Sequence, residues 1–340
     1  MYHLLALFSI SMYLVLSSMI QLTPAEGDAL TVSAIHSCNI KSGWRMLTDT
    51  CELELARTIL INGQQRDIRD FLNQDTRVTV LLGYNGQIVP IYTGYVTDFQ
   101  GTGPVQISCE DEMYLLKKGN LNKAFYGVQL DEVIDFIAPG WVAEVEDVNI
   151  GDFEISNATP AQTLKKLSEP PYNLFAHMVP GTRILRVGFP YMREGVRHVA
   201  HLQRNVKGKS LEWQNVDESK IQVKAISHLR NGAVLTSLYP KKLEGASQRT
   251  MNVIGVTTTT ALDNMAKAEL DKLRLDGYAG TIDMFGAPEF TRVKHGDEIE
   301  IRDERYPERS GVYHLIDEVE TVFNAPSADY KQVLKLGKRI

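Results

Sequence analysis

The clearest periodic pattern in the chain lies between residues 77 and 109, where apolar and polar side chains alternate. Every second position from Val78 to Leu82 is apolar, which is the spacing of one face of a β-strand. The run ends at Asn85-Gly86, a pair that adopts the positive φ of a tight hairpin turn. Strands at 88–99 and 105–109 follow, so the pattern predicts an antiparallel sheet.

Two further strands are predicted upstream, at 32–40 and 51–57. The second of them separates its apolar side chains from its carboxylates, with Cys51, Leu53 and Leu55 on one face and Glu52 and Glu54 on the other. This separation is typical of an antiparallel sheet with one buried face. Trp44 and Leu47 are expected to anchor the connecting loop in the same core; stacking of Trp44 on a ligand is the alternative.

A different pattern follows residue 118. Apolar residues at i, i+3, i+4 and i+7 predict one face of a helix that ends at Pro139-Gly140, namely Leu130, Val133, Ile134 and Ile137. Thr159 and Gln162 have the spacing of a capping box around Pro160 at the first helical position. With a hairpin over 175–189, residues 119 to about 195 are predicted to form a small α/β unit.

Strands resume in the last third of the chain. Residues 196–210 are polar and basic and are predicted to be a connection, and 223–237 reads as a hairpin around Asn231-Gly232. A helix is expected between a cap at Thr260 and Gly277, followed by strands up to residue 336.

The C-terminal strands repeat the order of parts found in the first pattern. A strand with alternating Ile299 and Ile301 is followed by a loop, then by Gly311-Val-Tyr313 and a long strand that ends at Phe323. The corresponding N-terminal parts are Val78 and Val80, Gly94-Tyr95 and Phe99. This internal similarity predicts two related β-barrels in one chain.

Composition narrows the class of protein. The 340 residues are 44% hydrophobic and 23% charged, which is ordinary for a globular protein with two or three domains. Lys+Arg 36 against Asp+Glu 42 gives a net charge of −6, which disfavours a nucleic-acid binder that works by neutralising phosphates. Cys38, Cys51 and Cys109 match neither a disulfide framework nor a zinc motif, so reduced thiols are expected.

The apolar run from Leu4 to Leu22 has two interpretations. A signal peptide or membrane anchor is one, because of its length and hydrophobicity. A buried or half-buried β-hairpin is favoured, since no Lys or Arg precedes the run, several serines interrupt it, and residues 8–12 alternate.

Few side chains suggest catalysis. The acids Glu110-Asp111-Glu112 lack an accompanying ligand pattern and are expected to be solvated. Asp303-Glu304 is a carboxylate cluster without supporting groups, which is weak evidence for an active site. His198 and His201 stand three apart, but no third ligand is near, so two surface histidines are expected rather than a metal site. The sequence therefore predicts no catalytic, cofactor-binding or metal-binding residue.

Several strings in the two β-rich parts match a known family. The N-terminal strings are Ser42-Gly-Trp44, Leu47-Thr-Asp-Thr-Cys-Glu-Leu53, Val80-Leu-Leu-Gly-Tyr-Asn-Gly86, Gly94-Tyr-Val96 and Cys109-Glu-Asp-Glu-Met-Tyr-Leu-Leu-Lys117. The C-terminal strings are Gly277-Tyr-Ala-Gly280, Phe285-Gly-Ala-Pro288, Gly296-Asp297, Tyr306-Pro-Glu-Arg309, Gly311-Val-Tyr313 and Leu336-Gly337. They resemble the two tube domains of phage baseplate hub proteins, the late-control D family, which is related to the hub part of type VI secretion spike proteins.

The resemblance implies a mainly β fold with an α+β insert: two tube-type β-barrels plus a small α/β domain. The expected divisions are 1–118 for the first barrel, 119–205 for the insert, and 206–340 for the second barrel with one helix, with part of 206–250 packing on the first barrel. The implied role is structural and not enzymatic. A homotrimeric, pseudo-hexameric ring would adapt the sixfold tail tube above it to a trimeric spike below.

The implied partners are the tail tube and spike proteins, other baseplate proteins and the tape measure protein, with no stable membrane association. DNA would pass through the channel without specific binding, past carboxylates such as Glu52, Glu54 or Glu300. The location would be the virion tail tip, after assembly in the bacterial cytoplasm. Two alternatives stay open: a tail-associated cell-wall hydrolase that uses the acidic clusters, and a secreted β-rich binding protein.

Overall fold

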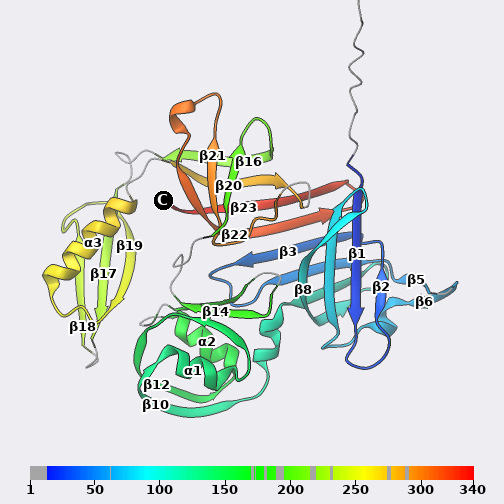
Figure 1. Cartoon of the computed structure of the whole chain (residues 1–340), viewed down its shortest axis with the longest axis horizontal. Helices are drawn as coiled ribbons and strands as arrows, with labels where there is room; N and C mark the ends of the chain where they lie inside the picture. Colours follow the sequence, from blue (N-terminus) through cyan, green and yellow to red (C-terminus); the bar gives the residue numbers. More distant parts are fainter. Residues whose placement is uncertain are drawn as a thin grey trace, which may run out of the picture.

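The computed structural model describes residues 14–340 apart from 62, 170–171, 173, 180–181, 189–194, 215–219, 230–232, 274–276 and 288–290. Within these residues the protein is mainly β, with an α+β insert, as the sequence predicts (Figure 1). None of the described helices is both long and apolar enough to cross a membrane.

Thirteen strands from both ends of the chain form one sheet. The N-terminal strands are β1 Leu16–Thr23, β2 Leu30–Val32, β3 Ser37–Gly43, β4 Thr50–Leu55, β7 Arg77–Tyr84, β8 Gln87–Gln100 and β9 Val105–Glu110. The C-terminal strands are β15 Arg197–His201, β16 Val206–Gln214, β20 Gly277–Phe285, β21 Glu298–Arg302, β22 Tyr313–Asn324 and β23 Asp329–Arg339. Their order is β16-β20-β23-β22-β3-β4-β9-β8-β7-β1-β2, and β21 joins β15 to β22.

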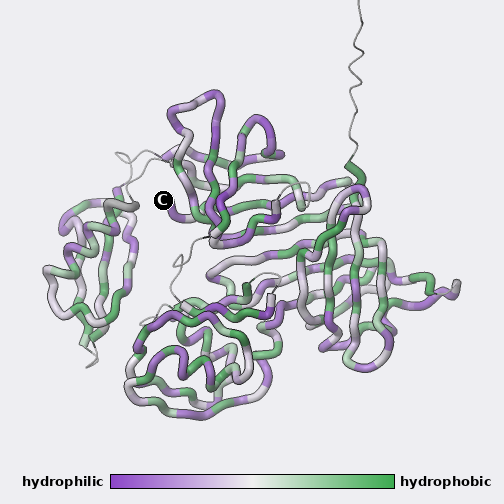
Figure 2. Tube along the Cα trace, in the orientation of Figure 1, coloured by the Kyte–Doolittle hydropathy of each residue, from purple (hydrophilic) through white to green (hydrophobic). Residues whose placement is uncertain are grey.

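The predicted alternation is confirmed in the N-terminal strands. In β4 the residues Cys51, Leu53 and Leu55 are buried while Glu52 is exposed, and Figure 2 shows this change of polarity along many strands. The turn between β7 and β8 has φ of 52° at Asn85 and 79° at Gly86, as the hairpin prediction requires.

Short elements connect these strands. They include three described 3-10 helices: η1 Ile68–Phe71, η2 Glu112–Lys117 and η4 Pro307–Arg309, which follows β21. The two-stranded hairpin of β5 Thr58–Ile61 and β6 Gln64–Asp67 projects from the body of the molecule (Figure 1).

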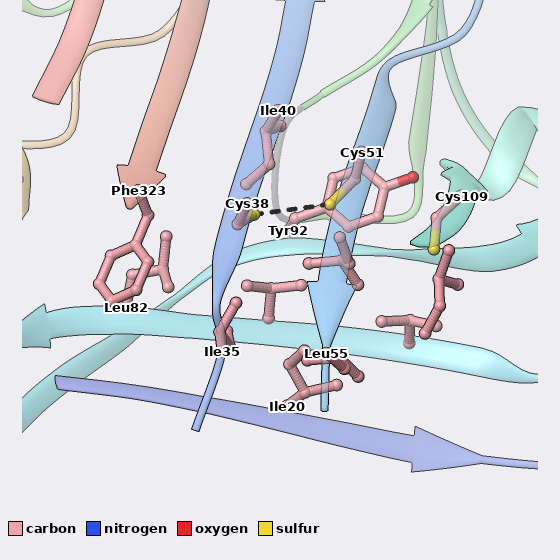
Figure 3. Close-up of a cluster of buried hydrophobic side chains, with 14 of the residues drawn as sticks. Ile20, Ile35, Cys38, Ile40, Cys51, Leu55, Leu82, Tyr92, Cys109 and Phe323 are labelled. Atoms are coloured by element: carbon pink, nitrogen blue, oxygen red, sulfur yellow. Dashed lines mark hydrogen bonds between the residues drawn. The ribbon is translucent and has the colours of Figure 1, made fainter. Parts of the chain in front are cut away.

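The long hairpin of β22 and β23 belongs to two cores. Val319 and Leu334 pack in the C-terminal core, whereas Phe323 and Tyr330, nearer the tip, pack in the N-terminal core. Figure 3 shows Phe323 in the same cluster as Leu82 and the N-terminal cysteines. The two barrels therefore share a strand pair as well as a sheet.

The internal repeat predicted from sequence appears as a repeated strand order. The N-terminal series β3-β4-β9-β8-β7 corresponds to the C-terminal series β16-β20-β23-β22-β21. In both series the fourth and third strands form a hairpin, and the connecting loops, 101–104 and 325–328, have the same length. The repeat is thus carried by topology more than by matching residues.

The α/β unit has its own core, built from residues 113–187. Its strands are β10 Leu121–Gln129, β11 Val142–Val145, β12 Asn149–Ala158, β13 Phe175–Met178 and β14 Ile184–Gly188. The helices α1 Leu130–Ile137 and α2 Pro160–Ser168 pack on them. The predicted capping box is confirmed: the hydroxyl of Thr159 accepts a bond from the Gln162 N–H, and the Gln162 side chain accepts one from the Thr159 N–H.

A second small unit separates β16 from β20. Its sheet, in the order β18-β17-β19, contains β17 Ile221–His228, β18 Val234–Tyr239 and β19 Ser247–Ile254. Helix α3 Thr259–Leu273 covers this sheet and buries Leu262, Ala266 and Leu270 against it. The predicted Asn231-Gly232 turn lies outside the described residues. The domain divisions at residues 118 and 205 stay predictions.

The predicted connection between the insert and the second barrel is wrong. Residues 196–210 are not a connection, because they contain β15 and the start of β16. Their many polar side chains are explained by the position of β16 at the outer end of the sheet path. At the N-terminus, Leu16–Thr23 forms β1 and pairs with β7, while residues 4–13 of the predicted hairpin lie outside the described part.

Candidate functional site: the polar face of the joined sheet

The two halves of the sheet meet in a backbone ladder between β22 and β3. Seven residue pairs, from Glu318 opposite Gly43 to Asn324 opposite Ser37, align antiparallel. Side chains alternate across this joint: Val319, Thr321 and Phe323 point into the cores and are buried. Glu318 and Glu320 point the other way, because successive strand residues face opposite sides.

The side opposite the cores is continuous over six strands, since directly paired residues share a face. We call it the polar face and define it by the residues whose register places them together: Thr281, Asp283, Phe285, Asp329, Lys331, Val333, Lys335, Glu318, Glu320, Val322, Asn324, Ser37, Asn39, Lys41, Gly43, Thr50, Glu52, Glu54, Gln106, Ser108 and Glu110.

On the C-terminal half of the polar face, lysines neutralise the carboxylates. The ammonium of Lys331 lies 2.7 Å from an oxygen of Asp283, and that of Lys335 lies 2.7 Å from an oxygen of Glu318. At the joint, Glu320 accepts a bond of 2.8 Å from the Asn39 amide and lies 3.7 Å from the ammonium of Lys41. These contacts link the two halves of the sheet by side chains as well as by backbone.

Strand β4 carries the excess of negative charge. Glu52 accepts a bond of 2.9 Å from the Ser108 hydroxyl, and Glu54 accepts one of 3.0 Å from the Ser37 hydroxyl. The cation nearest to Glu54 among the described residues is the imidazole of His36 at 3.8 Å, which is charged only when protonated. A hydroxyl donor leaves the negative charge in place, so this stripe repels polyanions.

Glu300 does not belong to this stripe. It lies in β21, is 7% exposed, and accepts two bonds of 2.9 Å from the guanidinium of Arg302. The Arg302 bonds hold the pKa of the Glu300 carboxyl below its ordinary value. Of the three carboxylates proposed from sequence, Glu52 and Glu54 thus share one surface and Glu300 is an internal ion pair.

The acids at 110–112 are not all solvated, which corrects the sequence interpretation. Asp111 is buried and caps η2, with one carboxyl oxygen accepting from the Met113 N–H and the other from the Asp49 N–H, each at 3.0 Å. Burial raises the pKa of Asp111 to about 7. Glu112 is 4% exposed and is held by Arg77 at 3.2 Å and Arg183 at 3.1 Å.

The other candidate groups also serve packing. Asp303 is buried and accepts bonds from Gln203 at 2.6 Å and from the Tyr278 hydroxyl at 3.3 Å, whereas Glu304 is exposed. His198 is buried, which corrects the surface prediction, and lies 3.0 Å from Asp297. Because both histidines lie on a strand, a spacing of three places them on opposite faces.

No group of three or more His, Cys, Asp and Glu side chains within the described residues has the arrangement of a metal site. The three cysteines are free and buried, with the sulfur atoms of Cys38 and Cys51 at 3.8 Å. Burial raises the pKa values of Cys51 and Cys109, which keeps both as unreactive thiols.

Side-chain contacts join the α/β unit to the two barrels and the barrels to each other. The indole N–H of Trp44 donates a bond of 3.0 Å to Asp317, and its ring packs edge-on against Phe175 at 4.9 Å. The guanidinium of Arg292 donates to the backbone oxygens of Pro90 at 3.2 Å and Ile91 at 2.6 Å. Trp44 therefore anchors its loop, as predicted. It does so where the N-terminal barrel, the C-terminal barrel and the α/β unit meet.

No protein-family model matches the chain, and no curated protein matches it. Solved structures do. A tail protein from Neisseria meningitidis is similar at 17% identity and a TM-score of 0.62, over 95% of this chain and 96% of that one. The 43 kDa tail protein of prophage MuSo2 from Shewanella oneidensis is similar at 14% identity and a TM-score of 0.60, over 95% and 98%.

A third similar structure comes from a secretion system. An Escherichia coli component of the type VI secretion system, described as structurally similar to the T4 phage tail proteins gp27 and gp5, matches at 8% identity and a TM-score of 0.55. The match covers 94% of this chain and 76% of that one. The chain therefore has the fold shared by phage tail proteins and type VI secretion spike-like proteins, as its sequence predicts. These similarities favour neither a hydrolase nor a secreted binding protein.

Proposed function

We propose that the protein is the baseplate hub at the tip of a phage tail or a related contractile injection system. The observation that carries this proposal is the ladder between β22 and β3, which fixes two topologically equivalent barrels side by side in one chain. Three copies would then present six equivalent barrels around an axis, because closed cyclic assemblies repeat one interface.

Such a ring would act as a symmetry adaptor. Six near-equivalent barrel ends would continue the tail tube above, while the inserted units, present once per chain, would give threefold symmetry below for the spike. The tail tube and spike proteins would be the direct partners, with other baseplate proteins and the tape measure protein as neighbours. The assembled hub would belong to the virion tail tip and form in the host cytoplasm.

The polar face is our candidate for the channel wall. Its C-terminal carboxylates are paired with lysines, and the excess charge on β4 is negative. DNA would slide past such a surface without binding, since phosphates are repelled where no cation is in excess. The role is proposed to be non-enzymatic, because the buried carboxylates described above are occupied in caps and ion pairs.

The test is the native mass of the purified chain over a range of concentrations, by mass spectrometry and light scattering. The expected species has about three times the 38.2 kDa mass of one chain. Electron microscopy of that species should show closed rings, which should bind both a trimeric spike and tail-tube protein. A chain that stays monomeric at every concentration, with spike protein present or absent, would contradict the proposal. A cell-wall turbidity assay on the same sample tests the hydrolase alternative.

A further inference from the structure

The small unit between β16 and β20 ends in a strand with an open edge. Strand β19 pairs with β17 over Ser247–Ile254 and, among the described strands, with no other. Its eight residues include neither Pro nor Gly, and its register with β17 is unbroken. Such an edge presents a regular row of unpaired N–H and C=O groups to another chain.

The core beside this edge is incomplete. Helix α3 packs on β17 and β18 and leaves most of β19 uncovered (Figure 1). Val223 and Ala225 of β17 are fully buried, whereas Met251 and Val253, on the same face of β19, are half-buried. Apolar side chains on a strand added along β19 would cover both of these residues and complete the core.

Strand β18, at the other end of this sheet, offers a poorer edge. It has six residues and is followed by Pro240, which has no N–H to donate. Helix α3 is fixed over this strand, because the hydroxyl of Ser237 donates a hydrogen bond to a carboxyl oxygen of Asp263 in the helix. The longer, uncovered edge is therefore that of β19.

The surface around β19 is basic. Residues 221–273 contain seven Lys and Arg but four Asp and Glu, whereas the whole chain has more acids than bases. Arg249 is exposed on β19 and makes no ion pair with any described residue. Lys220 lies beside the start of the strand, since its backbone oxygen accepts a bond of 2.8 Å from the Ser247 N–H. A partner with carboxylates would be attracted to this edge, and a basic partner would be repelled.

We propose that β19 receives an extended acidic segment of a partner protein, which adds a strand to the sheet of the small unit. The segment would place apolar side chains at alternate positions against Met251 and Val253, and a carboxylate against Arg249. Backbone hydrogen bonds give affinity in this mode of recognition, and the alternate side chains give specificity. The inference goes beyond the proposed function and does not depend on it, because β19 lies outside the joined sheet of the two barrels.

A synthetic peptide tests the edge. The sequence Glu-Thr-Val-Thr-Val-Thr-Glu carries its valines and glutamates on one face of a strand. It reads the same in both directions, so it fits β19 in a parallel or an antiparallel sense. We expect saturable binding of the labelled peptide to the intact chain by fluorescence anisotropy. The peptide with lysine in place of both glutamates should bind about tenfold more weakly.

Charge reversal on the protein supplies the matched variants. Arg249→Glu should weaken binding of the acidic peptide about tenfold and strengthen binding of the lysine peptide. Lys267→Glu, on an exposed position of α3, is the control and should change neither affinity by more than about twofold. Both side chains are exposed, so both variants should fold. Hydrogen exchange locates the site: the acidic peptide should protect amides of Ser247–Ile254.

Several results would overturn the proposal. These are no binding of either peptide, equal binding of both to the parent protein, or protection of Val234–Tyr239 in place of β19. Amides of β19 that become protected without peptide as the protein concentration rises would assign the edge to a second copy and would also overturn it. None of these results contradicts the hub function, which the native mass tests separately.

Discussion

The hydroxyl of Tyr84 donates a hydrogen bond of 3.0 Å to the backbone oxygen of Tyr330, a residue 246 positions later in the chain. The two rings lie 5.3 Å apart, and both residues are buried in the N-terminal core. Because Tyr330 belongs to the β22–β23 hairpin, this contact joins the two barrels inside the protein, behind the ladder that joins them at the sheet.

Tyr84→Phe removes this bond and leaves a buried carbonyl oxygen with one partner fewer. We expect the free energy of unfolding to fall by about 1 to 3 kcal/mol, which is the cost of an unsatisfied buried polar group. Urea unfolding followed by tryptophan fluorescence measures the change. Tyr126→Phe is the control, because that side chain is 83% exposed and should change stability little. Equal stability of Tyr84→Phe and the parent would contradict the linking role of the bond.

Gly286→Ala tests how closely the hairpin packs. A Cβ at residue 286 would lie 2.3 Å from the Tyr330 ring, so the ring must move out of its place in the core. We expect destabilisation of about 1 to 3 kcal/mol, as in other overpacked cores. Gly103→Ala is the control, since a Cβ there meets nothing within 4 Å. A thermal midpoint equal to that of the control would show that the hairpin tip has room to spare.

Glu112 and Glu110 form a matched pair for the brace between barrel and insert. Glu112 is buried and pairs with two arginines, whereas Glu110 is nearer the surface and pairs with the ammonium of Lys117. Glu112→Gln removes the charge that both guanidinium groups bind and should cost about 1 to 3 kcal/mol, since the arginines left behind are partly solvated. Glu110→Gln should cost less than about 1 kcal/mol. Limited proteolysis should cut Glu112→Gln faster at the α/β unit. Similar losses in both variants would argue against the brace.

Acid should weaken the contact between the α/β unit and the C-terminal barrel through His177. The ring of His177 lies edge-on to that of His295 at 4.7 Å. Burial lowers the pKa of His177 from 6.5 to about 4, with a smaller contribution from the charge of Arg186. Since the unfolded chain binds the proton first, His177 should favour the folded state fully above pH 6.5 and lose that contribution between pH 6.5 and 4. Glu144 opposes the shift, and the raised pKa of Asp111 gives the opposite pH dependence.

The measurement is therefore a difference between two proteins. His177→Phe keeps an aromatic ring against His295 and removes one titrating group. Between pH 6.5 and 4, the loss of unfolding free energy should be about 2 to 3 kcal/mol smaller in the variant than in the parent. Parallel pH profiles would show that His177 titrates normally in the folded protein.

Neutralising β4 tests the polar face as a channel wall. Glu52→Gln with Glu54→Gln should leave unfolding unchanged within about 0.5 kcal/mol, because both side chains lie outside the cores. Particles that carry this hub should release DNA more slowly, and lysines at both positions should slow release further at low salt. Glu308→Gln, with its side chain 68% exposed, is the control. Unchanged infectivity of the lysine variant would contradict the assignment.

Local patterns were enough to predict many elements. The alternation of Cys51, Leu53 and Leu55 and the capping box at Thr159 depend on neighbours within a few residues, so the sequence displays them directly. The polar stripe on β4 was also predicted, because a strand that buries one face exposes the other. The prediction that Glu300 belongs to this stripe is wrong. Glu300 is buried by segments that are distant in the sequence, and it pairs with Arg302.

Long-range features were not predictable in this way. The pairing of β22 with β3 joins residues such as Glu320 and Asn39 across most of the chain, and no local period encodes it. The sequence predicts a connection where β15 and β16 lie, because lysine and histidine side chains leave too few apolar residues for a clear alternation. The burial of Asp111 and Glu112 depends on a cap and on two arginines brought in by other elements.

The shared hairpin also sets the order in which the molecule is completed during synthesis. Phe323 and Tyr330 fill the core that surrounds Cys38 and Leu82, yet the ribosome adds them long after the other members of that core. The first barrel therefore stays unfinished until nearly the whole chain has emerged. A truncated product that lacks this hairpin would expose an incomplete core instead of a finished first barrel.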